Sequence, residues 1–195
     1  MTRNASVLAP VLRSETQARL LAAVLLHPDR EASIADLARE TGSDPGNLHA
    51  EVERLVQAGI LTDRRAGRTR LLRAGTSALI GPLANLLLLG YGPKTVVETA
   101  LRGTSGVEHA FIAGSWAARY HGQPGAFPND VDVIVVGKPD RDDVTEAVVE
   151  ALRTIGHDGQ VIFRSPSAWR DPKDAFTRTA KQRPVVELTI GAVHA

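Results

Sequence analysis

The spacing of apolar residues changes along this chain, and that change limits its fold more than any other feature. Between residues 14 and 60, apolar side chains recur every three or four positions, as in amphipathic helices. The clearest stripe consists of Ala18, Leu21 and Leu25. From residue 107 onward, short apolar runs typical of buried strands alternate with helical segments. These patterns predict an α/β (α+β) chain with a helical first domain and a mixed second domain.

Composition removes several classes of function. The chain contains no cysteine, which excludes disulfides, cysteine nucleophiles, zinc–thiolate sites and iron–sulfur clusters. Its formal net charge is only +1, so it is not uniformly polybasic. The most apolar stretch, residues 78–89, is far shorter than the roughly 20 residues that span a bilayer, and residues 1–15 lack the apolar run of a signal peptide. We therefore expect a cytoplasmic protein with no membrane partner.

Local signals in residues 1–75 predict three short helices and a hairpin. Ser33 is a suitable N-cap for the second helix, with Asp36 as its capping-box partner. The third helix should begin near Pro45, because proline is tolerated in a first turn, and end at Gly59. The extended runs that follow are joined by a short connection containing Gly67, which predicts a hairpin.

This order of elements resembles the ArsR/MarR-like winged helix-turn-helix regulators. The resemblance implies that residues 45–58 form a recognition helix and that the hairpin forms the wing of a module that binds double-stranded DNA. The implied DNA contacts are Asn47, His49, Arg64, Arg65, Arg68 and Arg70. The expected outer face of the third helix also includes Glu51 and Glu53, whose carboxylates would repel phosphates. A winged helix used for dimerisation or protein contact therefore stays an alternative.

The apolar pattern of residues 76–103 predicts a helical connector with a broad apolar face. Because large apolar faces are rarely left exposed to water, we expect this face to pack against the second domain or against a second copy of the chain. A homodimer formed through this connector is accordingly one option.

Two carboxylates and a Gly-Ser pair are the chemically informative residues of the second domain, residues 104–195. Asp130 and Asp132 lie on one expected strand and so point to the same side, roughly 6.5–7 Å apart. Two such carboxylates repel each other unless a divalent cation lies between them, and oxygen ligands favour Mg²⁺ or Mn²⁺. Upstream, Gly114 and Ser115 open an expected helix whose free backbone N–H groups favour a phosphate.

The segment IAGSWAARYHGQPGAFPNDVDVIVVG resembles the signature of the polymerase β-type nucleotidyltransferases. This resemblance implies a mixed β-sheet with flanking helices that binds a nucleoside triphosphate, with ATP the expected nucleotide, and Mg²⁺ or Mn²⁺. Gly114, Ser115 and Arg119 would bind the nucleotide, and Asp130 and Asp132 would be the metal-binding and catalytic carboxylates. The family's third carboxylate would be Glu187. The chain departs from the family pattern in its 14-residue spacer between Ser115 and Asp130, in the position of Arg119, and in having Glu where Asp is customary.

These patterns leave three functions open. The first is a DNA-binding nucleotidyltransferase that transfers a nucleoside monophosphate to a hydroxyl of a protein, RNA or small molecule, in an antitoxin-type or regulatory role. The second is a transcriptional regulator whose second domain is a catalytically weak or inactive nucleotide sensor. The third is an interaction scaffold that binds neither ligand. A transferase needs Glu187 or another base, whereas a sensor needs only Asp130 and Asp132.

Overall fold

The computed structural model describes residues 11–191, which divide between Gly92 and Pro93 into an N-terminal and a C-terminal unit. The expected connector, residues 76–103, contributes one helix to each unit, because α4 (Ile80–Tyr91) precedes this division and α5 (Pro93–Leu101) follows it. Within residues 11–191, every helix is too short or too polar to span a bilayer.

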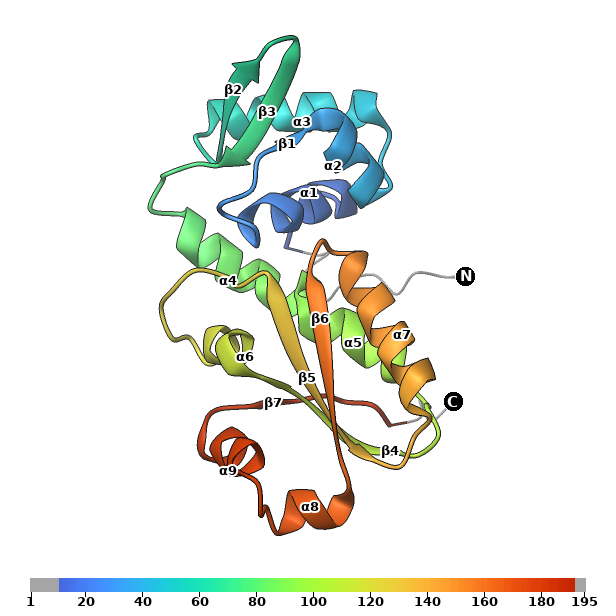
Figure 1. Ribbon diagram of the computed structural model, residues 1–195. Coiled ribbons are helices and arrows are strands. Elements are labelled where there is room, and N and C mark those ends of the chain that lie inside the picture. Colours follow the sequence, from blue (N-terminus) through green and yellow to red (C-terminus); the bar gives the residue numbers. More distant parts are fainter. Residues whose placement is uncertain (1–10, 192–195) are drawn as a thin grey trace. The chain divides into compact units, whose positions relative to one another are not determined.

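The N-terminal unit is helical with a small antiparallel sheet (Figure 1). Its elements, before α4, are α1 (Glu15–Leu25), β1 (Ala32–Ser33), α2 (Ile34–Thr41), α3 (Pro45–Gln57), β2 (Leu61–Ala66) and β3 (Thr69–Ala74). The sheet order is β1-β3-β2, and β2 and β3 form the predicted hairpin. The strand β1, which sequence patterns did not predict, is only two residues long and pairs with β3. The predicted winged helix-turn-helix fold is therefore confirmed.

Side-chain caps explain where the helices of this unit begin. Ser33 accepts a hydrogen bond from the backbone N–H of Asp36, and the Asp36 carboxylate accepts one from the backbone N–H of Ser33, as the predicted capping box requires. Asp44 caps α3 by accepting from the N–H groups of its first turn, with Pro45 as first helical residue. Leu37, Leu48 and other apolar side chains of these helices are fully buried and form the core.

The C-terminal unit is a four-stranded mixed sheet with helices. After α5 it contains β4 (Val107–Ala113), α6 (Gly114–Tyr120), β5 (Asp130–Gly137), α7 (Arg141–Arg153), β6 (Asp158–Arg164), α8 (Pro166–Arg170), α9 (Ala175–Gln182) and β7 (Val186–Glu187). The strand order is β6-β5-β4-β7, with β5 and β6 parallel and the other pairs antiparallel. The α+β class predicted from the sequence is confirmed.

Strand register assigns the side chains of this sheet to two faces. Phe111, Ile134 and Val136 lie on one face and pack with Ala180 of α9 and Trp169 of α8. The intervening residues of β5 lie on the other face, which α7 covers.

Two further segments of the C-terminal unit can be compared with their sequence patterns. The apolar run of residues 184–190 predicts a strand, but only the two-residue strand β7 forms there, and it pairs with β4. Residues 167–180 predict a helical stretch with breaks at Asp171 and Pro172, and the structure has the helices α8 and α9 on either side of these two residues.

Candidate functional site

Asp130 and Asp132 lie at the beginning of β5, on the same face of the sheet. Asp130 is exposed and Asp132 is half-buried, while Val131 between them is fully buried on the opposite face. Burial raises the pKa of the Asp132 carboxyl above its ordinary value, and the nearby charge of Asp130 raises it further. The pair therefore carries negative charge that a bound cation would stabilise.

The start of α6 packs directly against Asp132. Gly114, the first residue of α6, has a φ of +65° and a Cβ built on it would lie 2.8 Å from Asp132 Oδ2. Only a residue without a side chain combines this backbone conformation with so close an approach. Ser115 follows Gly114 and is exposed. The structure thus brings the Gly-Ser pair and Asp132 together.

Glu187 lies apart from the two aspartates. It pairs with Phe111 of β4, and Phe111 pairs with Ile134 of β5. Glu187 is therefore two strands away from β5 and level with Ile134, which lies two residues after Asp132. Strand spacing places the Cα atoms of Glu187 and Asp132 about 12 Å apart. The Glu187 side chain is 65% exposed, and its Oε1 lies 3.3 Å from His109 Nδ1. No three His, Asp or Glu residues within the described range 11–191 are arranged to hold a metal ion.

The residues that flank the aspartates come from β6, and sequence reasoning missed them. The parallel register places Asp158 beside Asp130 and Gln160 beside Asp132, and both are exposed. The signal that could have found them is the strand–helix–strand order, since a crossover through a helix returns the chain to a parallel neighbouring strand. The side chain next to Asp132 is therefore an amide, which cannot act as a general base.

Arg119, the third residue expected to bind nucleotide, lies in the last turn of α6. Its Nε and Nη1 are shielded from solvent and find no hydrogen-bond acceptor among the described residues. Its guanidinium packs against the backbone at Gly125, where a Cβ would lie 2.0 Å from Nη1. Buried N–H groups without an acceptor are ones that an anion can satisfy.

In the N-terminal unit, α3 presents Asn47 and His49 to solvent, as expected for the outer face of a recognition helix. Glu51 does not lie on that face, so the prediction that it belongs to the outer face of the third helix was wrong. Its side chain is 8% exposed, because Leu48, Glu51 and Leu55 are spaced three and four residues apart and share the inner side of α3.

Three partners satisfy the buried Glu51 carboxylate. It accepts hydrogen bonds from Gln17 Nε2 at 2.7 Å and from Arg54 Nη1 at 2.8 Å, and Arg13 Nη1 lies 3.5 Å away. The negative charge expected to repel phosphates is thus removed from the outer face of α3 and neutralised within the unit.

Glu53 remains on the accessible side of α3, and Arg70 of the wing neutralises it. The Arg70 guanidinium forms an ion pair with Glu53 and a second one with Asp63, whose Oδ2 lies 2.8 Å from Arg70 Nε. The hydrogen bond from Arg70 lowers the pKa of the Glu53 carboxyl, and both carboxylates raise the pKa of Arg70. Arg70 therefore connects the wing to α3, with two of its guanidinium nitrogens already engaged.

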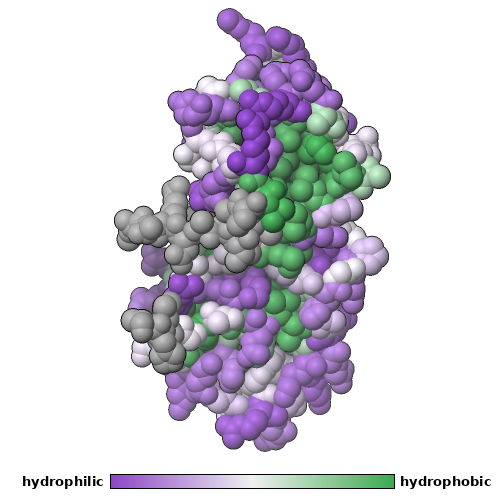
Figure 2. All heavy atoms as spheres, turned by 180° about the vertical axis from the view of Figure 1, so that it is seen from behind, coloured by the Kyte–Doolittle hydropathy of each residue, from purple (hydrophilic) through white to green (hydrophobic). Residues whose placement is uncertain are grey.

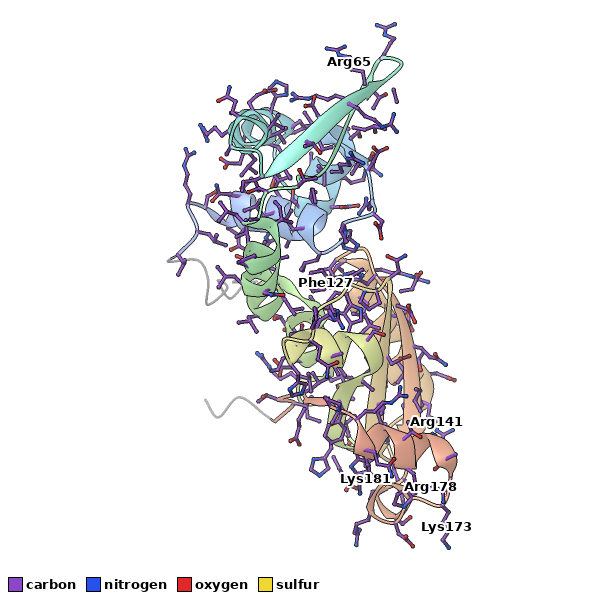
Figure 3. All side chains as sticks on the ribbon, turned by 90° about the vertical axis from the view of Figure 1, so that its left-hand side faces the viewer. Arg65, Phe127, Arg141, Lys173, Arg178 and Lys181 are labelled. Carbon is purple, nitrogen blue, oxygen red and sulfur yellow. The ribbon has the colours of Figure 1, made fainter. Side chains whose placement is uncertain are left out.

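Of the three other wing arginines expected to contact DNA, one is ion-paired and two form no ion pair within the described residues. Arg64 forms a two-point ion pair with Glu31, and the hydrogen bond between them lowers the pKa of the Glu31 carboxyl. Arg65 and Arg68 flank the turn at Gly67, are exposed, and form no ion pair with any residue of the described range. Figure 3 shows Arg65 at the outer end of the hairpin.

Comparison with known protein families bears on this unit. A model of the MarR family matches residues 13–70, which extend from just before α1 into β3. Residues 13–70 are a MarR-family winged helix-turn-helix. Searches of curated proteins and of solved structures find no match to the chain.

The MarR-family match identifies the type of the N-terminal unit and indicates DNA binding and transcription regulation. It covers α3 and most of the wing, the two elements that carry the expected DNA contacts. It does not extend to the C-terminal unit, where the Gly-Ser pair and the two aspartates lie.

Proposed function

We propose that this protein is a transcription regulator that binds double-stranded DNA through its MarR-family winged helix and binds a nucleoside triphosphate with Mg²⁺ in its C-terminal unit. The observation that carries the first part is the distribution of charge on the winged helix. Both carboxylates of α3 are neutralised by protein partners, whereas Arg65 and Arg68 at the wing tip form no ion pair with any residue that the structure describes.

Each part of the winged helix has a role in this proposal. Asn47 and His49 on α3 would contact base edges in the major groove, where amide and imidazole groups find donors and acceptors. Arg65 and Arg68 would contact phosphates or a narrow minor groove beside it. Arg70 would act indirectly, by keeping the Glu53 charge neutralised and the wing in register with α3.

Winged helices of the MarR type are often dimeric, and a homodimer is part of the proposal. The segment of α4 offers an apolar surface for it, since Leu79 is 63% and Leu89 is 59% exposed. Figure 2 shows apolar side chains gathered on the face of the protein opposite to the view in Figure 1. Two winged helices related by a two-fold axis would bind two half-sites of one duplex.

Fluorescence anisotropy with a labelled pool of random duplexes at several salt concentrations tests DNA binding. The double substitution Arg65→Ala/Arg68→Ala should reduce the slope of log affinity against log salt by about 1.8, because each lost phosphate contact contributes about 0.9. The control is Arg102→Ala/Arg153→Ala, which removes two exposed arginines of the C-terminal unit. An equal loss in the control, or no dependence of wild-type binding on salt, would contradict the proposal.

The C-terminal unit supports nucleotide binding more than transfer. Mg²⁺ is commonly held by one or two carboxylates together with phosphate oxygens, and Asp130 and Asp132 are such a pair. When bound, the ion would neutralise negative charge on the phosphates. Gly114 and Ser115 would hold the phosphates beside Asp132, and Arg119 would supply a cation.

Transfer of a nucleoside monophosphate to a hydroxyl would additionally need a base near this pair. Glu187, the predicted third carboxylate, is turned toward His109, and Gln160 occupies the position beside Asp132, while one further carboxylate, Asp158, lies beside Asp130. Because the predicted base does not lie at Asp132, a regulator whose C-terminal unit is a catalytically weak or inactive sensor fits the described residues better than a transferase that uses Glu187.

Isothermal titration with each nucleoside triphosphate and Mg²⁺ tests this part. Asp130→Asn/Asp132→Asn should abolish binding, whereas Glu187→Gln should leave the Kd unchanged. Incubation with α-labelled nucleotides and cell extract tests transfer separately. Label that appears on a protein or an RNA with the wild type, and not with Glu187→Gln, would overturn the sensor function and establish a transferase.

A further inference from the structure

Positive charge is concentrated in residues 164–183, a segment that plays no part in the sites described above. These twenty residues include six basic and two acidic side chains, a net charge of +4, whereas the whole chain carries only +1. The basic residues are Arg164, Arg170, Lys173, Arg178, Lys181 and Arg183. The rest of the chain is therefore net acidic, and this segment is basic by contrast.

The fold places three of these cations on the outer side of α9 and on the loop before it. Thr177 and Ala180 are buried on the inner side of α9. Arg178 and Lys181, which directly follow these two residues in sequence, are exposed. They are three residues apart on the helix, which places their Cβ atoms roughly 5–6 Å from each other. Figure 3 shows Arg178, Lys181 and Lys173 at the end of the C-terminal unit that α8 and α9 form.

Neighbouring carboxylates do not neutralise this basic surface, defined as Lys173, Arg178 and Lys181. None of the three forms an ion pair with any residue in the described range. Of the two acidic side chains in the segment, Asp174 is engaged with Arg164 at 3.5 Å and with the N–H of Thr177, so it serves as the cap of α9.

Trp169 adds an aromatic group beside these cations. Lys181 donates a hydrogen bond to the Trp169 carbonyl at 2.9 Å, and its Nζ lies 5.7 Å from the centre of the indole ring. The Trp169 ring is only half-buried, and it stacks on Phe111 in the core at 4.9 Å between ring centres. This packing holds Lys181 at the surface, close to the neighbouring Arg178.

We propose that the basic surface of Lys173, Arg178 and Lys181 binds the phosphodiester backbone of a nucleic acid, independently of the winged helix. Three exposed like charges repel one another, so the surface is stabilised by a partner that offers several negative charges at short spacing. A phosphodiester backbone offers one charge at every nucleotide. Arginine and lysine together suit such a backbone, and the protein already has a unit whose family binds DNA.

The test separates this surface from the winged helix by using the full chain with Arg65→Ala/Arg68→Ala as the background. Anisotropy is measured with a labelled random duplex and with a labelled single-stranded RNA of the same length, at several salt concentrations. Lys173→Ala/Arg178→Ala is then added to the background, because both side chains are exposed and form no ion pair within residues 11–191. Lys181→Ala follows in a third variant, with thermal melting to compare stability.

The double substitution should reduce the salt slope by about 1.8 for the duplex or by about 1.4 for the single strand. The probe with the larger affinity loss identifies which nucleic acid the surface prefers. The matched control, Arg102→Ala/Arg153→Ala in the same background, removes the same charge and should leave the slope unchanged.

Three results would overturn the proposal. They are no binding of either probe in the wing background, an equal loss in the control, and displacement by polyglutamate as effective as by unlabelled nucleic acid of equal charge. The last result would assign the surface to an acidic protein. None of them bears on DNA binding by the winged helix, which the wing substitutions test in the wild-type chain.

Discussion

Replacing Gly114 with alanine should destabilise the C-terminal unit by displacing Asp132. At this position φ is +65°, and the new Cβ would lie 2.8 Å from Asp132 Oδ2. Gly122 offers a matched control in the same unit, because its φ is +73° and a Cβ there would meet no described residue within 4 Å. Both substitutions impose the backbone cost of a left-handed residue, and only Gly114→Ala also forces a side chain to move.

The two costs can be estimated separately. A left-handed conformation costs a residue with a Cβ about 1–2 kcal/mol, so both substitutions should lower the free energy of unfolding by that amount. Turning the Asp132 carboxylate away from its present rotamer costs about 0.5–1.5 kcal/mol more. Gly114→Ala should therefore lower the free energy of unfolding more than Gly122→Ala does, and the difference should equal the cost of moving the Asp132 carboxylate.

Urea unfolding followed by tryptophan fluorescence measures this difference in the full chain. Both tryptophans, Trp116 and Trp169, belong to the C-terminal unit, so the signal reports on that unit. Repeating both glycine substitutions in an Asp132→Ala background completes a double-mutant cycle, since that variant has no carboxylate to displace. There, Gly114→Ala and Gly122→Ala should cost the same.

The cycle has a clear refuting outcome. A coupling energy between Gly114→Ala and Asp132→Ala below about 0.3 kcal/mol is within the range of independent sites. It would mean that Asp132 does not lie against the start of α6, and the geometric basis for a shared phosphate and cation site would be lost.

Three further predictions concern caps and charges. Ser33→Ala should lower the free energy of unfolding of the N-terminal unit by about 1 kcal/mol, measured by urea unfolding followed by circular dichroism, and Ser33→Thr should retain the cap. The pKa of Asp132 is raised on folding, so the wild type should lose stability relative to Asp132→Asn as pH rises from about 4 through the folded pKa. Unfolding at pH 4 and pH 7 checks this, and a stability difference that does not change with pH would contradict it. Arg70→Met should weaken DNA binding severalfold by leaving Glu53 un-neutralised. Addition of Glu53→Gln should restore it in anisotropy titrations, and no restoration would mean that Arg70 contacts DNA directly.

Local features of the winged helix could be read from the sequence. The capping box at Ser33, the proline at the start of α3 and the glycine in the hairpin turn were all predicted, because each depends on residues within four positions of one another. The placement of Asp130 and Asp132 on one face follows from strand alternation in the same way.

Long-range pairing explains what the sequence did not indicate. Glu51 was expected on the outer face of α3, but Gln17, 34 positions earlier in the chain, forms part of its buried environment. Glu187 was predicted as a third carboxylate of the site, and strand pairing places it two strands across from β5, level with Ile134 rather than with Asp132. No pattern within α3 determines which distant side chains surround Glu51. Likewise, no pattern within β7 determines which strand it pairs with or in which register.

The sequence by itself thus determined the order of the elements, their caps and the faces that bear chemical groups, because helix and strand periodicity act over a few residues. Only the tertiary structure decided which charges are available. Of the four wing arginines expected to contact DNA, Arg64 and Arg70 are engaged by carboxylates on other elements, whereas Arg65 and Arg68 form no ion pair within residues 11–191. An ion pair requires two side chains to meet in space, and residues distant in sequence meet only through the packing of the whole unit.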